Sequence, residues 1–253
     1  MTERLFTSES VSSGHPDKLC DQISDAILDA CIRIDPFARV AVETLVKGMS
    51  DKSLIVLGGE VTVKGETPDY EQIARDVCAE VGYNSHEIGM DATSEELCEV
   101  RVAITTQSPD ISDGVNVGGA GDQGMMFGYA CTESESFPGL IGTYMPLPSI
   151  LSQQLTRRLT EVREKNLLPW VRPDGKSQVT IEYDENGTPL RASTIVLANQ
   201  HKDLTEETGS IDAELEYIHQ ELRKHVIEYV IPVELIDSET KIIVNGTGRF
   251  VDP

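Results

Sequence analysis

The sequence lacks several features, and each absence excludes a class of protein. Its 253 residues contain no long apolar run, so we expect neither a transmembrane helix nor a membrane partner. The segment from Met1 to Phe6 has no basic stretch leading into an apolar one, which predicts no export signal. The five cysteines never form a C-x-x-C pair, which argues against a zinc site and a disulfide framework. A reducing, cytoplasmic location fits this pattern.

Basic residues are also scarce. Lys and Arg number 21 against 43 Asp and Glu, which gives a formal net charge of −22. Such a surface repels the phosphate backbone, so we expect no nucleic-acid partner. A small polyanion such as ATP can still bind if Mg²⁺ and a few basic residues reverse the field inside one cleft. Those few basic residues are the functional candidates.

The common nucleotide-binding fingerprints are missing. No G-x-x-x-x-G-K-[ST] loop is present, and no G-x-G-x-x-G turn opens a helix. The five histidines show no metal-binding spacing, and His201, His219 and His225 are expected at the surface. A nucleotide site in this chain must therefore be built from other segments.

Hydrophobic periodicity predicts the order helix, strand, strand, helix, strand, and predicts it twice. The first copy covers residues 16–34, 40–46, 53–63, 68–81 and 100–104, and the second covers 151–162, 179–183, 195–197, 215–226 and 242–244. We predict repeated α+β domains with helices on one face of mostly antiparallel sheets. The predicted divisions are an N-terminal domain at 1–107, a glycine-rich mobile loop at 108–124, a central domain at 125–245, and the start of a further domain at 246–253.

A glycine-bearing turn meets a helix N-terminus in the segment from Ser12 to Lys18. Free backbone N–H groups and the positive helix end favour phosphate there, while His15 can add charge and Asp17 can hold Mg²⁺. The same residues also suit a simple helix cap, with Ser12 or Ser13 as the capping residue. Both interpretations stay open from this segment alone.

Three further segments carry polar candidates. Asp174-Gly-Lys176 lies immediately ahead of a predicted strand, where a surface turn is the alternative. The segment 245–250 combines a flexible backbone with a guanidinium for phosphate and an aromatic ring for a base, although a strand-end turn also explains it. Glu43 and Glu60 lie on the two strands of the predicted hairpin, and Glu60 follows two glycines.

Five segments, in order, resemble the signature segments of the S-adenosylmethionine synthetase (methionine adenosyltransferase) family. They are LFTSESVSSGHPDKLCDQISDA (residues 5–26), QSPDI (107–111), GAGDQGMMFGY (119–129), LPWVRPDGKSQVT (168–180) and GTGRFV (246–251). Five long motifs in one order are far more specific than any single short pattern. The resemblance covers nearly the whole chain.

The resemblance implies that the sulfur of L-methionine attacks C5′ of ATP and releases tripolyphosphate, which is then hydrolysed to phosphate and diphosphate. It implies Mg²⁺ at Asp17 and K⁺ at Glu43, with His15 and Lys176 as the catalytic residues. The implied ATP-binding residues are His15, Asp174, Gly175, Lys176, Arg249 and Phe250, and the implied methionine-binding residues are Glu60, Gln107 and Asp122.

The family also implies three similar α+β domains and a homodimer or homotetramer. Its members continue past the segment that here ends at Pro253, so this chain resembles a C-terminally truncated member without the third domain. Gly246 stands where the family has a proline. The alternative is an inactive family member that binds nucleotide or a full-length partner subunit.

Overall fold

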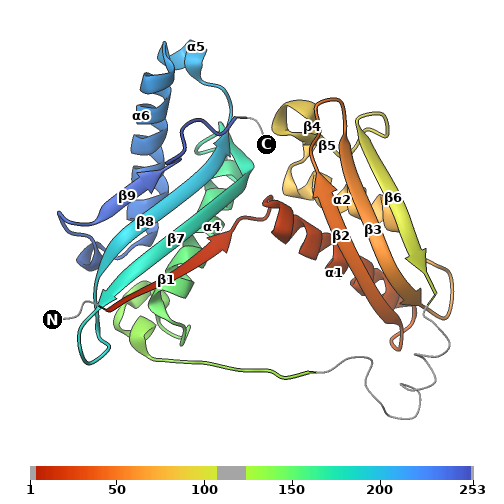
Figure 1. Ribbon diagram of the computed structural model, residues 1–253, viewed down its shortest axis with the longest axis horizontal. Coiled ribbons are helices and arrows are strands. Elements are labelled where there is room, and N and C mark those ends of the chain that lie inside the picture. Colours follow the sequence, from red (N-terminus) through yellow and green to blue (C-terminus); the bar gives the residue numbers. More distant parts are fainter. Residues whose placement is uncertain (1–3, 107–123, 252–253) are drawn as a thin grey trace. The chain divides into compact units, whose positions relative to one another are not determined.

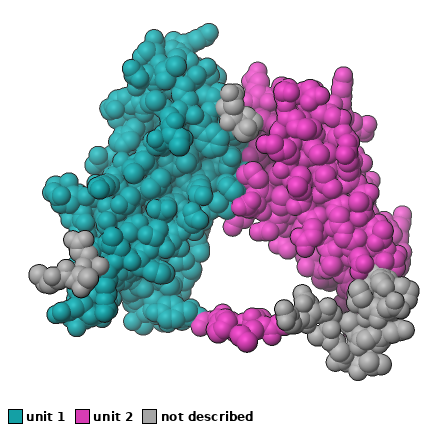
Figure 2. Space-filling model, viewed as in Figure 1, with its two compact units in different colours: residues 1–15, 129–253 teal, residues 16–128 magenta. Residues whose placement is uncertain are grey.

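The computed structural model describes residues 4–106 and 124–251, which belong to two compact units (Figures 1 and 2). Unit 1 comprises residues 1–15 and 129–253, and unit 2 comprises residues 16–128. No helix in the described ranges is both long and apolar enough to cross a membrane.

Unit 2 is a three-stranded sheet with two helices on one face (Figure 1). Helix α1 (Pro16–Ile34) buries Leu19, Ile23, Ile27 and Cys31, at the spacing of one helical stripe. Strands β2 (Arg39–Lys47) and β3 (Ser53–Thr62) form an antiparallel hairpin, helix α2 (Tyr70–Val81) follows, and β6 (Cys98–Thr105) pairs parallel to β3. Short elements β4 (Asn84–Ser85), η1 (His86–Ile88) and β5 (Met90–Asp91) connect α2 to β6.

Helix α2 begins and ends at residues suited to those positions. The Asp69 carboxylate accepts the Gln72 N–H, and Gly82 takes the left-handed conformation, with φ of 116°, after the last turn. The core of unit 2 then closes between α1, α2 and the covered sheet face.

Three cysteines lie in this core, and burial changes their reactivity. Cys31, Cys78 and Cys98 are fully buried, and burial raises the pKa of the Cys78 thiol to about 12. Because the thiolate is the reactive form, we expect iodoacetamide at pH 8 to leave Cys78 unmodified in the folded protein and to modify all five cysteines in denaturant. Peptide mass mapping measures this, and rapid native labelling of Cys78 would contradict its burial.

Unit 1 is a four-stranded sheet in the order β1-β7-β8-β9. The bounds of its strands are β1 (Arg4–Val11), β7 (Val171–Tyr183), β8 (Pro189–His201) and β9 (Lys241–Val244). Neighbouring strands are antiparallel, except that β9 runs parallel to β8. The helical elements are η2 (Glu133–Ser136), η3 (Pro138–Leu140), α4 (Leu147–Glu164), α5 (Thr205–Thr208), α6 (Ile211–Leu222), η4 (Arg223–Ile227), α7 (Glu228–Val230) and η5 (Val233–Leu235).

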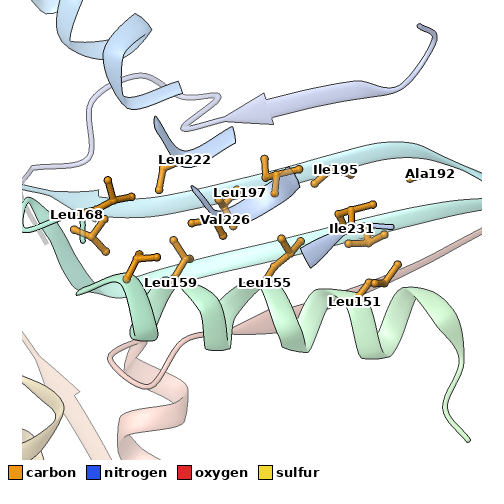
Figure 3. Close-up of a cluster of buried hydrophobic side chains, with 14 of the residues drawn as sticks. Leu151, Leu155, Leu159, Leu168, Ala192, Ile195, Leu197, Leu222, Val226 and Ile231 are labelled. Carbon is orange, nitrogen blue, oxygen red and sulfur yellow. The ribbon is translucent and has the colours of Figure 1, made fainter. Parts of the chain in front are cut away.

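The core of unit 1 lies between its sheet and its helices. Leu155 and Leu159 of α4 face Ile195 and Leu197 of β8 (Figure 3), and all four are 1% exposed or less. The predicted helix over 215–226 is longer in the structure, because α6 passes into a π-helical turn and then α7. This packing fixes the β7–β8 hairpin that carries much of the candidate site.

The predicted repeat is confirmed. In each unit an antiparallel hairpin is followed by a helix and by a third strand parallel to the hairpin's second strand, β3 with β6 and β8 with β9. Strand β1 was not predicted, and it extends the sheet of unit 1 by pairing with β7. Residues 1–15 consequently belong to unit 1, whereas the sequence prediction placed residues 1–107 in one domain.

Candidate functional site

The turn before α1 is tied to β7, about 160 residues later in the chain. The Ser12 N–H donates to the Gly175 carbonyl at 2.8 Å, and the buried Ser12 hydroxyl donates to the Pro173 carbonyl at 2.7 Å. The His15 N–H closes the turn on the Ser12 carbonyl at 3.1 Å. The Ser12 hydroxyl, one of the two caps considered for α1, is therefore used to hold two candidate segments together.

Gly14 is the residue that permits this approach. A Cβ at Gly14 would lie 2.3 Å from the Pro173 Cβ and 2.5 Å from the Pro173 carbonyl carbon, far inside contact distance. Any other residue at Gly14 would push the turn away from β7. Since His15 follows directly, its backbone position depends on this contact.

The segment 174–176 lies inside β7, not ahead of a strand as predicted. The strand begins at Val171, and its register with β8 shifts between Val171 and Gly175. Gly175 is buried, and a Cβ there would lie 2.9 Å from the Asn199 amide nitrogen. The Lys176 ammonium is half exposed, 3.4 Å from the Glu9 carboxylate of β1.

Two buried asparagines connect β7 to the 245–250 segment. The Asn199 side-chain amide donates to the carbonyls of Arg172, at 3.1 Å, and Asp174, at 2.8 Å. The Asn199 backbone N–H donates to the Asn245 side-chain oxygen at 2.8 Å, and the Asn245 amide donates back to the Asn199 carbonyl at 3.1 Å. Three segments that are far apart in sequence, 12–15, 172–176 and 245–250, are thus joined within unit 1.

Arg249 is held by two carboxylates. Its Nε donates to Glu214 Oε2 at 2.7 Å, and its Nη2 lies 2.8 Å from Asp203 Oδ1. Glu214 is fully buried and also accepts the Leu204 N–H at 2.6 Å. Hydrogen bonds from Thr205 and then from Arg249 lower the pKa of Asp203, and the two carboxylates, Asp203 first, raise the pKa of Arg249. The guanidinium is therefore oriented before any ligand binds.

Phe250 is anchored by a histidine that sequence reasoning misjudged. His201 is 0% exposed, so the expectation that it lies at the surface is wrong. The Phe250 N–H donates to His201 Nε2 at 3.1 Å, and the His201 N–H donates to the Phe250 carbonyl at 2.9 Å. The sequence did contain a signal that His201 is buried: three polar residues, Asn199-Gln-His201, end a core strand. Buried polar groups need specific partners.

The other candidates with described positions belong to unit 2. Asp17 is exposed in the first turn of α1. Glu43 of β2 pairs with Gly58 of β3, and Glu60 is two residues after Gly58 on β3. Both glutamates therefore lie on the sheet face opposite the core.

Within residues 4–106 and 124–251, no group of three or more His, Cys, Asp or Glu residues could hold a metal ion. Gln107 and Asp122 lie outside the described residues.

The described part of the site in unit 1 has the groups needed for a nucleotide. It offers a partly buried histidine at a glycine turn, an exposed ammonium, an oriented guanidinium and an aromatic ring. Cations and backbone N–H groups suit phosphate oxygens, and a ring suits a base.

Two family models match the chain. The model described as the N-terminal domain of S-adenosylmethionine synthetase matches residues 3–109, and the model described as its central domain matches residues 117–250. Both β7 and the 245–250 segment fall within the second match. The turn at residues 12–15 falls within the first.

Proposed function

Because this chain belongs to the S-adenosylmethionine synthetase family, we propose that it is a methionine adenosyltransferase, which makes S-adenosylmethionine from ATP and L-methionine. The observation that supports this proposal is the joining of the turn 12–15, β7 and the 245–250 segment by Ser12, Asn199 and Asn245. A set of unrelated caps and turns would not need such mutual contacts. We expect the reaction in the cytoplasm.

The chemistry explains the types of residue involved. A neutral methionine sulfur that attacks C5′ of ATP needs no general base, so the rate depends on in-line positioning and on stabilising the leaving tripolyphosphate. We assign His15 to donate a hydrogen bond to the oxygen at the breaking bond. Lys176 and Arg249 neutralise phosphate charge, Phe250 packs on the base, and the backbone at Asp174 and Gly175 orients the nucleotide. The tripolyphosphate is then hydrolysed to phosphate and diphosphate.

The donor chemistry of Asp17 and Glu43 fits Mg²⁺ and K⁺. Both ions prefer oxygen ligands, and Mg²⁺ is commonly held by one or two carboxylates together with substrate phosphates, so the absence of a three-carboxylate cluster in the described part does not conflict with it. When bound, Mg²⁺ would neutralise phosphate charge. This acidic chain has few basic side chains that could do so. Asp17 would hold Mg²⁺ and Glu43 would hold K⁺.

Methionine is assigned to Glu60, Gln107 and Asp122. Glu60 lies on the exposed sheet face of unit 2 beside Gly58 and Gly59, where the backbone leaves room for a ligand. A carboxylate there can pair with the α-ammonium group of the amino acid. We also propose that the functional form is a homodimer or homotetramer.

A product assay tests the proposal. The chain is incubated with ATP, L-methionine, Mg²⁺ and K⁺, and S-adenosylmethionine and phosphate are quantified by mass spectrometry and colorimetry. Product that requires both substrates supports the function. ATP binding without product would instead indicate an inactive nucleotide-binding member of the family, and the absence of both would contradict the proposal.

His15→Ala should lower kcat by about 10² and change ATP affinity little, because the proposed hydrogen bond strengthens as charge develops on the departing oxygen. Steady-state kinetics and calorimetry separate the two effects. His219→Ala, which changes a histidine on α6 to which no role in the site is assigned, is the matched control and should behave as wild type. Near-normal turnover of His15→Ala would exclude this role.

A further inference from the structure

His201 has an unusual place for a histidine with no assigned role. It is the last residue of β8, it is fully buried, and both its backbone and its ring bind the backbone of Phe250. The ring therefore supplies one of the hydrogen bonds that hold the 249–250 segment, beside the backbone bond of His201 and the ion pairs of Arg249.

The hydrogen bonds define the protonation state of the ring. Because the Phe250 N–H donates to Nε2, that nitrogen must carry a lone pair. Nδ1 lies 2.8 Å from the Lys202 carbonyl, which can only accept, so Nδ1 carries the proton. The arrangement requires the neutral Nδ1–H tautomer. A second proton on Nε2 would point at the Phe250 N–H and replace an attraction by a donor–donor clash.

Charged residues lie close to His201 in space or along the adjoining segments. Glu214 Oε1 of α6 lies 3.9 Å from Nδ1, but the other oxygen of that carboxylate is already paired with Arg249. The remaining charged residues on the adjoining segments are Lys202 and Asp203 after β8, Arg249 before Phe250, and Arg172, which follows the β7 partner of His201.

We propose that His201 is a positioning residue that holds Arg249 and Phe250 in their nucleotide-binding conformation only while its ring is neutral, so that ATP affinity falls when the ring is protonated. This inference rests on the proposed function, since it concerns the same nucleotide site. Protonation removes the acceptor for Phe250, and the segment that carries both the guanidinium and the aromatic ring loosens together. The affinity for ATP therefore falls as the pH falls and recovers as the pH rises.

The test compares wild type with His201→Gln. The glutamine side-chain oxygen can accept the Phe250 N–H in place of Nε2 and does not titrate. Titration calorimetry with Mg²⁺ and ATP is run from pH 8 to pH 5, the range over which imidazoles titrate. We expect the ratio of the two dissociation constants to change by about tenfold across this range, through weaker binding to wild type. Protonation of the nucleotide and of His15 affects both proteins equally and cancels in the ratio.

A second measurement does not depend on ATP. In ¹H–¹⁵N spectra of the nucleotide-free protein, the Phe250 backbone amide should shift with pH in wild type and stay constant in His201→Gln. A constant amide in wild type, or identical pH profiles of affinity in the two proteins, overturns the inference. If neither protein binds ATP while the amide titrates as expected, the contact is right, and both the proposed function and the nucleotide effect are wrong.

Discussion

Replacing Gly59 by alanine should lower the free energy of unfolding of unit 2 by about 3 kcal/mol. Gly59 has φ of 136°, a region that residues with a Cβ rarely adopt, and a Cβ there would lie 2.0 Å from the Ala41 carbonyl oxygen. Both the local strain and the collision must be relieved by moving β2 away from β3. The neighbouring strand pair of Ala41 with Glu60 would be lost first.

Gly58→Ala is the matched control. A Cβ at Gly58 meets nothing within 4 Å, and its φ is ordinary, so the change should alter stability by less than about 1 kcal/mol. Urea unfolding followed by circular dichroism measures the global effect, and hydrogen exchange of β2 and β3 peptides locates it. Equal effects of the two substitutions would show that the conformation of Gly59 does not matter.

The same substitution bears on the proposed methionine and K⁺ sites. Glu60 follows Gly59, and Glu43 pairs with Gly58, so a displaced hairpin moves both carboxylates. Methionine affinity should therefore fall in Gly59→Ala. Retained affinity in a destabilised Gly59→Ala protein would argue that Glu60 does not bind methionine.

The regular elements were predictable because each carries its own signal. In α1 the buried residues Leu19, Ile23 and Ile27 recur at helical spacing, and in α2 the last turn is followed by Gly82. Such patterns arise from burial of one face, which depends only on local periodicity. The repeated order of elements, and with it the fold class, followed from these local signals.

Strand β1 could not be predicted in the same way. Five of its eight residues are exposed, no buried residue alternates along it, and its partner on β7 is far away in the chain, with Arg4 opposite Tyr183. A strand that extends a sheet mainly through backbone hydrogen bonds leaves little trace in the side-chain pattern. The place of residues 1–15 in unit 1 follows from this strand.

The site shows the same contrast. Glycines and charged residues marked the segments 12–18, 174–176 and 245–250, but the residues that join them did not stand out. Asn199 and His201 acquire their roles from partners at Asp174 and Phe250, and the polar run that contains them does not indicate which partners those are. A buried polar side chain can be explained only when its partners are known.

The contact at Gly14 leads to the largest expected loss of activity. In Gly14→Ala the new Cβ would overlap the backbone of Pro173, with 2.5 Å to its carbonyl carbon and 2.6 Å to its carbonyl oxygen, and neither atom can move without distorting β7. The turn must therefore separate from the strand. The two hydrogen bonds of Ser12 to Pro173 and Gly175 would be lost or lengthened as a result.

The kinetic consequence follows from the position of His15. A shift of about 1 Å in a catalytic group can cost 10²-fold in rate, and here the segment of β7 that we propose to bind phosphate is disturbed as well. We expect kcat/KM to fall by a factor on the order of 10³, more than for His15→Ala, and ATP affinity to fall too.

Gly139→Ala is the control for this substitution. A Cβ at Gly139, in the same unit, meets nothing within 4 Å, so this variant should keep wild-type kinetics. Because Ser12 and Pro173 both belong to unit 1, fluorescence of the only tryptophan, Trp170, reports whether that unit still folds. A folded Gly14→Ala protein with normal kcat/KM would show that the turn 12–15 takes no part in catalysis.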